Sequence, residues 1–127
     1  MKAASTDKRI LLIEDYDDFR KMVADYLKTQ DSTFEIFEAS SGELGIVTAL
    51  REKPNIILMD IRLPNMNGID TAAKIKKYLP DCKIIALTMF ETATFREVFK
   101  SGDISAYVGK SELHEKLMPL IQKYFKV

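Results

Sequence analysis

Short, uninterrupted apolar runs constrain the fold of this chain more than any other feature of its sequence. Residues 10–13 (ILLI), 56–59 (IILM) and 84–87 (IIAL) contain no polar side chain. Continuous runs of this length are typical of parallel strands that are covered on both faces of a sheet. Residues 34–39 and 104–108 mix apolar and polar side chains, as strands at the edges of a sheet do. We therefore predict five strands, of which the first, third and fourth are central.

The segments between and after these strands have the apolar spacing of helices. Strict alternation of strands and helices predicts an α/β fold, a doubly wound, five-stranded parallel sheet with helices on both faces. The flavodoxin-like strand order 2-1-3-4-5 places both mixed strands at the edges, which agrees with their composition. The apolar helical positions are Phe19, Met22, Val23, Tyr26 and Leu27; Leu44, Ile46, Val47 and Leu50; Ile69, Ala72, Ala73, Ile75 and Leu79; Phe95, Val98 and Phe99; and Leu113, Leu117, Leu120, Ile121 and Tyr124.

Local signals indicate where some of the helices begin. Ser40 and Glu43 have the spacing of a capping box, so we expect Ser40 to cap the second helix. Ser111 is the expected N-cap of the last helix. Pro119 falls within this last helix, where proline costs about 3 kcal/mol. We expect the helix to bend at Pro119 or to start later in the chain.

Length, charge and cysteine content restrict the classes of protein to consider. The 127 residues correspond to one domain, residues 1–127, in which we expect residues 1–8 to form a flexible N-terminus. The 19 basic and 19 acidic residues balance, which argues against direct nucleic-acid binding because that usually needs a basic stripe. No apolar run approaches the ~20 residues of a membrane helix. A single cysteine, Cys82, excludes an internal disulfide and fits a reducing compartment. We predict a cytoplasmic protein that does not bind membranes.

Polar residues follow the ends of the predicted strands. Glu14 and Asp15 come after the first strand, Asp60 after the third, Thr88 after the fourth and Lys110 after the fifth. Ligands of open α/β sheets bind beyond the carboxyl ends of the strands, in the crevice where the strand order reverses. We therefore expect three carboxylates, a hydroxyl and an ammonium to converge at one edge of the sheet.

This set of side chains suits phosphoryl chemistry. Three neighbouring carboxylates remain ionised only if a cation compensates their repulsion. An all-oxygen site with few protein ligands suits Mg²⁺, with Mn²⁺ as an alternative. A carboxylate such as Asp60 can act as a nucleophile and form an aspartyl-phosphate. The metal ion, Lys110 and the Thr88 hydroxyl would then neutralise the phosphoryl oxygens.

Gly109, Lys110 and Ser111 also match the last residues of the nucleotide-binding P-loop. That loop has the pattern G-x-x-x-x-G-K-[ST], and Ile104 occupies the position of its first glycine. A nucleotide site is therefore disfavoured. Each of the other polar residues has an ordinary explanation when it is taken alone, since acids such as Glu14 are favoured at a helix N-terminus. The functional interpretation depends on their convergence.

Four segments that carry these residues resemble one protein family. LLIEDYDDFR, IILMDIRLPNMNGID, IIALTMF and AYVGK together look like the receiver domain of response regulators in bacterial two-component signalling systems, including the chemotaxis regulators. The resemblance extends from about Arg9 to the final helix. It implies that Asp60 accepts a phosphoryl group from a sensor histidine kinase or a phosphotransfer protein. It also implies that Glu14, Asp15, Asp60 and the backbone carbonyl of Arg62 hold the metal ion.

The same resemblance implies a switch. Lys110 pairs with the phosphoryl group, Thr88 moves toward it, and Tyr107 turns inward in response. The change reaches the surface formed by the fourth helix, the fifth strand and the fifth helix. The partners implied are the kinase and either an output protein or an output domain missing from this sequence, and a phosphorylation-dependent homodimer is compatible with this scheme.

Two other functions stay open at this point. One is a phosphatase-type enzyme that forms an aspartyl-phosphate; it is disfavoured because enzymes of the haloacid-dehalogenase type carry D-x-D and Arg62 stands at the second position. We therefore expect no turnover of external substrates. The other is a binding module that works without phosphorylation. The chain departs from the common receiver pattern at Ser111, where many receivers have proline, and at Met89, whose bulk we hypothesise lengthens the phosphorylated lifetime by restricting water.

Overall fold

A parallel sheet forms the centre of the molecule. The computed structural model describes residues 8–63, 65–89 and 102–125. Within these ranges the strands are ordered β2-β1-β3-β4-β5, and all neighbouring pairs are parallel. The predicted fold class and strand order are therefore confirmed. The strands are β1 (Arg9–Ile13), β2 (Glu35–Ala39), β3 (Ile56–Asp60), β4 (Lys83–Thr88) and β5 (Ala106–Gly109).

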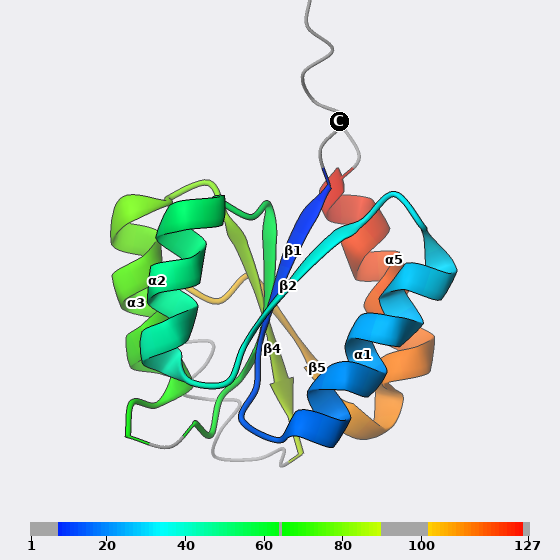
Figure 1. The fold of residues 1–127 in the computed structure, drawn as a ribbon, viewed down its shortest axis with the longest axis horizontal. Helices are drawn as coiled ribbons and strands as arrows, with labels where there is room; N and C mark the ends of the chain where they lie inside the picture. Colours follow the sequence, from blue (N-terminus) through cyan, green and yellow to red (C-terminus); the bar gives the residue numbers. More distant parts are fainter. Residues whose placement is uncertain (1–7, 64, 90–101, 126–127) are drawn as a thin grey trace, which may run out of the picture.

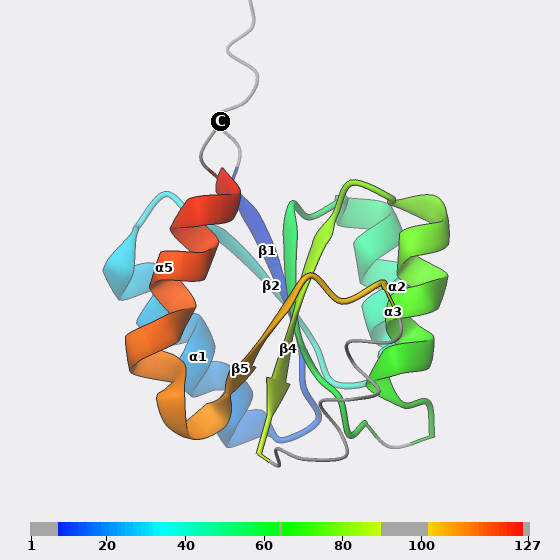
Figure 2. The same ribbon diagram turned by 180° about the vertical axis from the view of Figure 1, so that it is seen from behind.

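Helices cover both faces of this sheet. Helices α2 and α3 lie on one face and α1 and α5 on the other, as Figure 1 and the reverse view in Figure 2 show. The predicted fourth helix, with Phe95, Val98 and Phe99, lies outside the described residues. None of the helices in the described part of the chain is long and apolar enough to cross a membrane. The helices are α1 (Asp17–Gln30), α2 (Gly42–Glu52), α3 (Gly68–Tyr78) and α5 (Leu113–Phe125), with a 3₁₀ turn, η2 (Lys110–Glu112), before α5.

The central strands are buried on both sides, which explains their continuous apolar sequences. Alternate side chains of a strand point to opposite faces. Ile10 and Leu12 of β1 belong to the cluster under α1 and α5, whereas Leu11 and Ile13 belong to the cluster under α2 and α3. All the residues of β3 are buried. Strand β2 lies at an edge and exposes its two glutamates, which accounts for its mixed composition.

The start of α2 differs from the prediction by one residue. The N-cap is Ser41, not Ser40, and its side chain accepts a hydrogen bond from the Leu44 N–H (3.1 Å). The helix packs closely at its first turn, since a Cβ added to Gly42 would lie 2.5 Å from Thr71 Oγ1. Either of two adjacent serines can cap a helix. The close packing of Gly42 against Thr71, which favours a start after Ser41, is visible only in the folded structure. The predicted capping box with Glu43 is therefore wrong.

The prediction for Ser111 is also wrong, because this residue lies inside η2 and caps no helix. The chain leaves β5 through η2 and enters α5 at Leu113, which already has helical dihedral angles (φ −58°, ψ −45°). No separate cap is needed where a 3₁₀ turn runs into a helix in this way. Helix α5 begins at Leu113 and continues through Pro119. The described residues contain no cis peptide bond, so the Lys110–Ser111 peptide is trans.

The strand register brings the predicted polar residues together at the carboxyl ends of the strands. Ile13 pairs with Met59, so that Glu14 and Asp60 follow at the same level on neighbouring strands. Asp60 pairs with Leu87, and Thr88 pairs with Gly109. The start of β1 and the end of α5 lie together at the opposite end of the sheet, where the strands begin (Figures 1 and 2).

Candidate functional site

The acidic pair occupies the turn between β1 and α1. Glu14 is almost completely buried, at 3% exposure, whereas Asp15 is exposed. The Glu14 N–H donates to the carbonyl of Ala39 in β2 (3.0 Å), and Glu14 Oε2 accepts a hydrogen bond from the Tyr16 N–H (3.1 Å). The backbone and the side chain of Glu14 are therefore both held in place.

Asp60 is the last residue of β3 and lies beside β1. It is 8% exposed, and its Oδ1 accepts a hydrogen bond from the Arg62 N–H (3.0 Å). The start of α3 packs directly against it, because a Cβ added to Gly68 would lie 2.6 Å from the Asp60 carbonyl oxygen. The Gly68 N–H also donates to the carbonyl of Ile61 (2.8 Å). A glycine at the first turn of α3 thus allows the helix to support the loop that follows Asp60.

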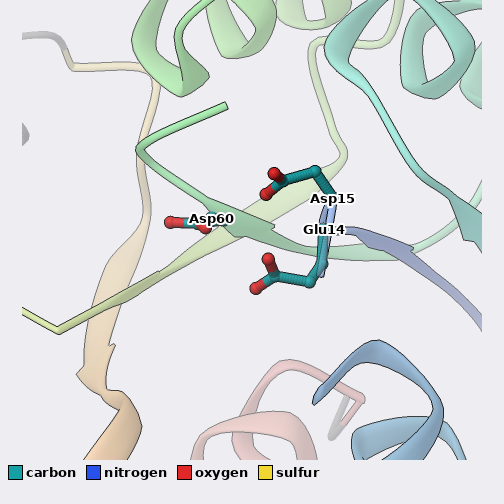
Figure 3. A group of neighbouring side chains, drawn as sticks. All are labelled: Glu14, Asp15 and Asp60. Atoms are coloured by element: carbon teal, nitrogen blue, oxygen red, sulfur yellow. The ribbon is translucent and has the colours of Figure 1, made fainter. Parts of the chain in front are cut away.

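The three predicted carboxylates form one cluster. A carboxylate oxygen from each of Glu14, Asp15 and Asp60 lies within 4.8 Å of the others. Figure 3 shows the three side chains turned to the same side at the ends of β1 and β3. Burial raises the pKa of Glu14 above its ordinary value, and the negative charge of Asp60 acts in the same direction. Three acids at such distances, one of them deeply buried, form a donor set that suits a hard divalent cation such as Mg²⁺.

Lys110 brings a positive charge to this cluster. Its Nζ lies 2.8 Å from Glu14 Oε1 and 3.4 Å from Asp60 Oδ2. Burial acts to lower the pKa of Lys110, but the hydrogen bond to Glu14 and the charges of both acids outweigh it, so the pKa lies above its ordinary value. The ammonium also lies 4.5 Å from the ring centroid of Phe19, on α1, which is a cation–π distance. The protein therefore holds a cation between two of the three acids.

The remaining predicted residues lie on strands β4 and β5 or in the loop beside the cluster. Thr88 is the last residue of β4 and is 4% exposed. Tyr107 lies in β5, is half-buried, and pairs with Ala86 of β4. Arg62 donates its backbone N–H to Asp60 Oδ1 (3.0 Å), whereas the prediction concerned its carbonyl. The structure thus joins Glu14, Asp15, Asp60 and Lys110, and puts Thr88 on β4, next to β3, and Tyr107 on β5, the following strand.

Two residues of this region were not predicted from the sequence as part of the site. Phe19 was assigned only to a helix face, yet its ring lies beneath Lys110. Arg20 is buried, and its guanidinium donates to the carbonyl of Glu14 (2.7 Å). A signal for Arg20 exists in the sequence, because its spacing from Val23 and Leu27 places a charged residue on the apolar face of α1.

Comparison with known proteins gives one consistent result. Residues 10–122 match the family model of the response regulator receiver domain. The chain is 29% identical over 120 residues to the response regulator protein VraR of Staphylococcus epidermidis, in an alignment that covers 93% of this chain and 56% of VraR. The chain therefore spans about half the length of the curated relatives it matches.

Solved structures agree with this match. The response regulator protein TrrA of Thermotoga maritima, solved in complex with Mg²⁺ and BeF, is 28% identical with a TM-score of 0.82, and the alignment covers 92% of this chain and 98% of TrrA. A DNA-binding response regulator of the LuxR family from Staphylococcus aureus is 27% identical with a TM-score of 0.83, and here the coverage is 94% and 99%.

Proposed function

The chain belongs to the response regulator receiver domain family, and on this premise we propose that it is a signalling switch activated by phosphorylation of Asp60. The main support for the proposal is the set of charged groups around the Asp60 carboxylate. Asp60 is buried at a strand end, with two further acids within 4.8 Å and an ammonium 3.4 Å away. A nucleophile among counter-charges in a partly dry site is the arrangement that phosphoryl transfer needs.

Asp60 is the nucleophile in this scheme. One of its carboxylate oxygens forms a bond to phosphorus while the bond from phosphorus to the donor breaks, and the donor is released. The donor is a phosphohistidine of a sensor kinase or phosphotransfer protein, or a small acyl phosphate in the laboratory. Asp60 is fixed for this step by the Arg62 N–H and by the contact of α3 with its backbone.

The acidic cluster fits a divalent cation. Glu14, Asp15 and Asp60 would hold Mg²⁺ or Mn²⁺, with the Arg62 carbonyl as a further oxygen donor. The position of Lys110 supports this fit, because its ammonium group, a positive charge, already lies between Glu14 and Asp60. A bound Mg²⁺ would neutralise charge on the phosphoryl group. The solved structure of TrrA with Mg²⁺ and BeF supports this assignment by family likeness.

Lys110 and Thr88 would receive the phosphoryl group. Lys110 is close enough to Asp60 to pair with a phosphoryl oxygen as a point charge. The Thr88 hydroxyl, at the end of the adjacent strand, would donate to a second oxygen. Its movement would leave room for Tyr107 to turn inward and would change the surface beside β5 and α5.

This switch is not an enzyme with external substrates, and its cellular partners follow from the family. We propose a cytoplasmic location, a sensor kinase or phosphotransfer protein upstream, and an output protein or output domain downstream. A single receiver domain over residues 1–127 and a phosphorylation-dependent homodimer both agree with this scheme. No observation favours the phosphatase-type alternative, because Arg62 lies at the position where a second catalytic acid would be required.

The test is a measurement of intact mass. The protein is incubated with acetyl phosphate and Mg²⁺, in parallel with Asp60→Asn and with a sample that contains EDTA. We expect one phosphoryl adduct on the wild type and none in the other two samples. Absence of an adduct on the wild type, or the same adduct on Asp60→Asn, would refute the proposal.

A further inference from the structure

Arg20 is a buried charged residue that the scheme above does not use. It lies on α1 and is 9% exposed, among the apolar residues that face the sheet. A buried guanidinium is costly unless its hydrogen bonds and its charge are matched. All three of its nitrogens have partners, which accounts for its burial: Nη1 donates to the Glu14 carbonyl (2.7 Å), Nε to Glu38 Oε1 (2.9 Å), and Nη2 pairs with Asp17 Oδ1 (2.7 Å).

These three partners belong to different parts of the fold. Glu38 lies in β2, Asp17 lies in the first turn of α1, and the Glu14 carbonyl belongs to the turn between β1 and α1. The planar guanidinium presents its N–H groups in fixed directions, which a lysine ammonium does not. Arg20 therefore ties this turn to an edge strand and to the start of a helix.

The contact with the Glu14 carbonyl has a specific consequence. This carbonyl is part of the peptide group that joins Glu14 to Asp15, so its orientation is coupled to the backbone angles that direct the Asp15 side chain. Glu14 has other anchors, at its N–H and at its carboxylate. Asp15 is exposed, and its direction depends on the peptide group that precedes it.

We propose that Arg20 is a positioning residue that orients the peptide group between Glu14 and Asp15 and thereby sets the divalent-cation affinity of the acidic cluster. The inference rests on the proposed function, because it concerns the same cluster. It assigns to Arg20 no contact with the cation or with the phosphoryl group. Removal of outer hydrogen-bond partners of metal-binding groups typically weakens metal affinity by about 10–100-fold.

The experiment compares Mg²⁺ binding by the folded wild type, Arg20→Met and Arg20→Lys, measured by calorimetry. Arg51→Met is the control, since Arg51 pairs with the neighbouring Glu52 at 2.9 Å on the surface of α2. We expect the dissociation constant to rise by about tenfold or more in Arg20→Met, less in Arg20→Lys, and not in Arg51→Met. The Mg²⁺ concentration that half-saturates phosphorylation by acetyl phosphate should rise by the same factor, while the rate at saturating Mg²⁺ stays within about twofold.

A purely structural role for Arg20 would lower the stability of the protein but leave Mg²⁺ binding by the folded fraction unchanged, and that result would overturn the inference. If Arg20→Met does not fold, Arg20→Lys decides, because a lysine keeps the positive charge but not the fixed N–H directions that reach the Glu14 carbonyl; a weaker Mg²⁺ affinity then supports the inference and an unchanged one overturns it. Absence of Mg²⁺ binding by the wild type would instead refute the proposed metal site, so the two failures are distinguishable.

Discussion

Lys110→Met removes the positive charge that lies between Glu14 and Asp60 and keeps an unbranched side chain in its place. The Lys110 Nζ is 2.8 Å from Glu14 Oε1 and 3.4 Å from Asp60 Oδ2. At an effective dielectric constant of about 20, these distances correspond to gross attractions of about 6 and about 5 kcal/mol. The cost of burying the charges offsets part of this, and removal of one partner of a buried pair lowers the unfolding free energy by about 3–5 kcal/mol. The Lys110 side chain keeps 14% exposure, so we expect the lower end of that range without metal ions.

The assay is urea unfolding in EDTA, with Lys116→Met as the matched control. Lys116 Nζ lies 2.9 Å from Glu112 Oε2, nearly the same distance, but the two side chains are 56% and 43% exposed. Pairs in water contribute little to stability, so we expect almost no change in the control. The deficit of Lys110→Met should shrink when Mg²⁺ is added, because the variant has no ammonium that competes with Mg²⁺ for Glu14 and Asp60, so the ion stabilises its folded state more than that of the wild type. Equal losses in the two variants would refute the argument that Lys110 compensates the acids.

Three further predictions concern single positions around the sheet. Gly68→Ala should slow adduct formation from acetyl phosphate, because the new Cβ would lie 2.6 Å from the Asp60 carbonyl oxygen and displace this residue; a wild-type rate would contradict this. Met89→Ala should shorten the lifetime of the phosphorylated form, since the Met89 side chain follows Thr88 and is 69% exposed beside the site; decay no faster than in the wild type would count against it. Burial raises the pKa of the Cys82 thiol to about 12, so iodoacetamide should modify it slowly in the native protein and rapidly in urea, and equal rates would show that the thiol is accessible.

The sequence predicted the central part of the fold because burial on both faces leaves an unambiguous pattern. Uninterrupted apolar runs identified β1, β3 and β4, and the mixed runs identified the edge strands. Strand order then fixed which residues end at the same edge, so Glu14, Asp15, Asp60 and Lys110 could be grouped before any contact was known. Those parts of the prediction depend on periodicity and topology alone.

The parts that failed depend on local geometry. The N-cap of α2 was assigned to Ser40, but the helix starts one residue later with Ser41 as its cap, where Gly42 packs closely against Thr71. Serine is a residue type that often caps helices, but Ser111 lies inside a 3₁₀ turn. Arg20 was overlooked because a charged residue is normally assigned to the surface, although its helical spacing placed it on the buried face. A charged residue in phase with an apolar stripe is therefore a useful signal of a supporting role beside a site.

The identity of the phosphoacceptor is tested most directly by locating the phosphoryl group on the chain. The protein is phosphorylated with acetyl phosphate and Mg²⁺, the acyl phosphate is reduced with borohydride, and the peptides are analysed by mass spectrometry. We expect the single modified residue to be Asp60, at the end of β3. Modification of Glu14 or Asp15 instead, or of several acids without preference, would contradict it.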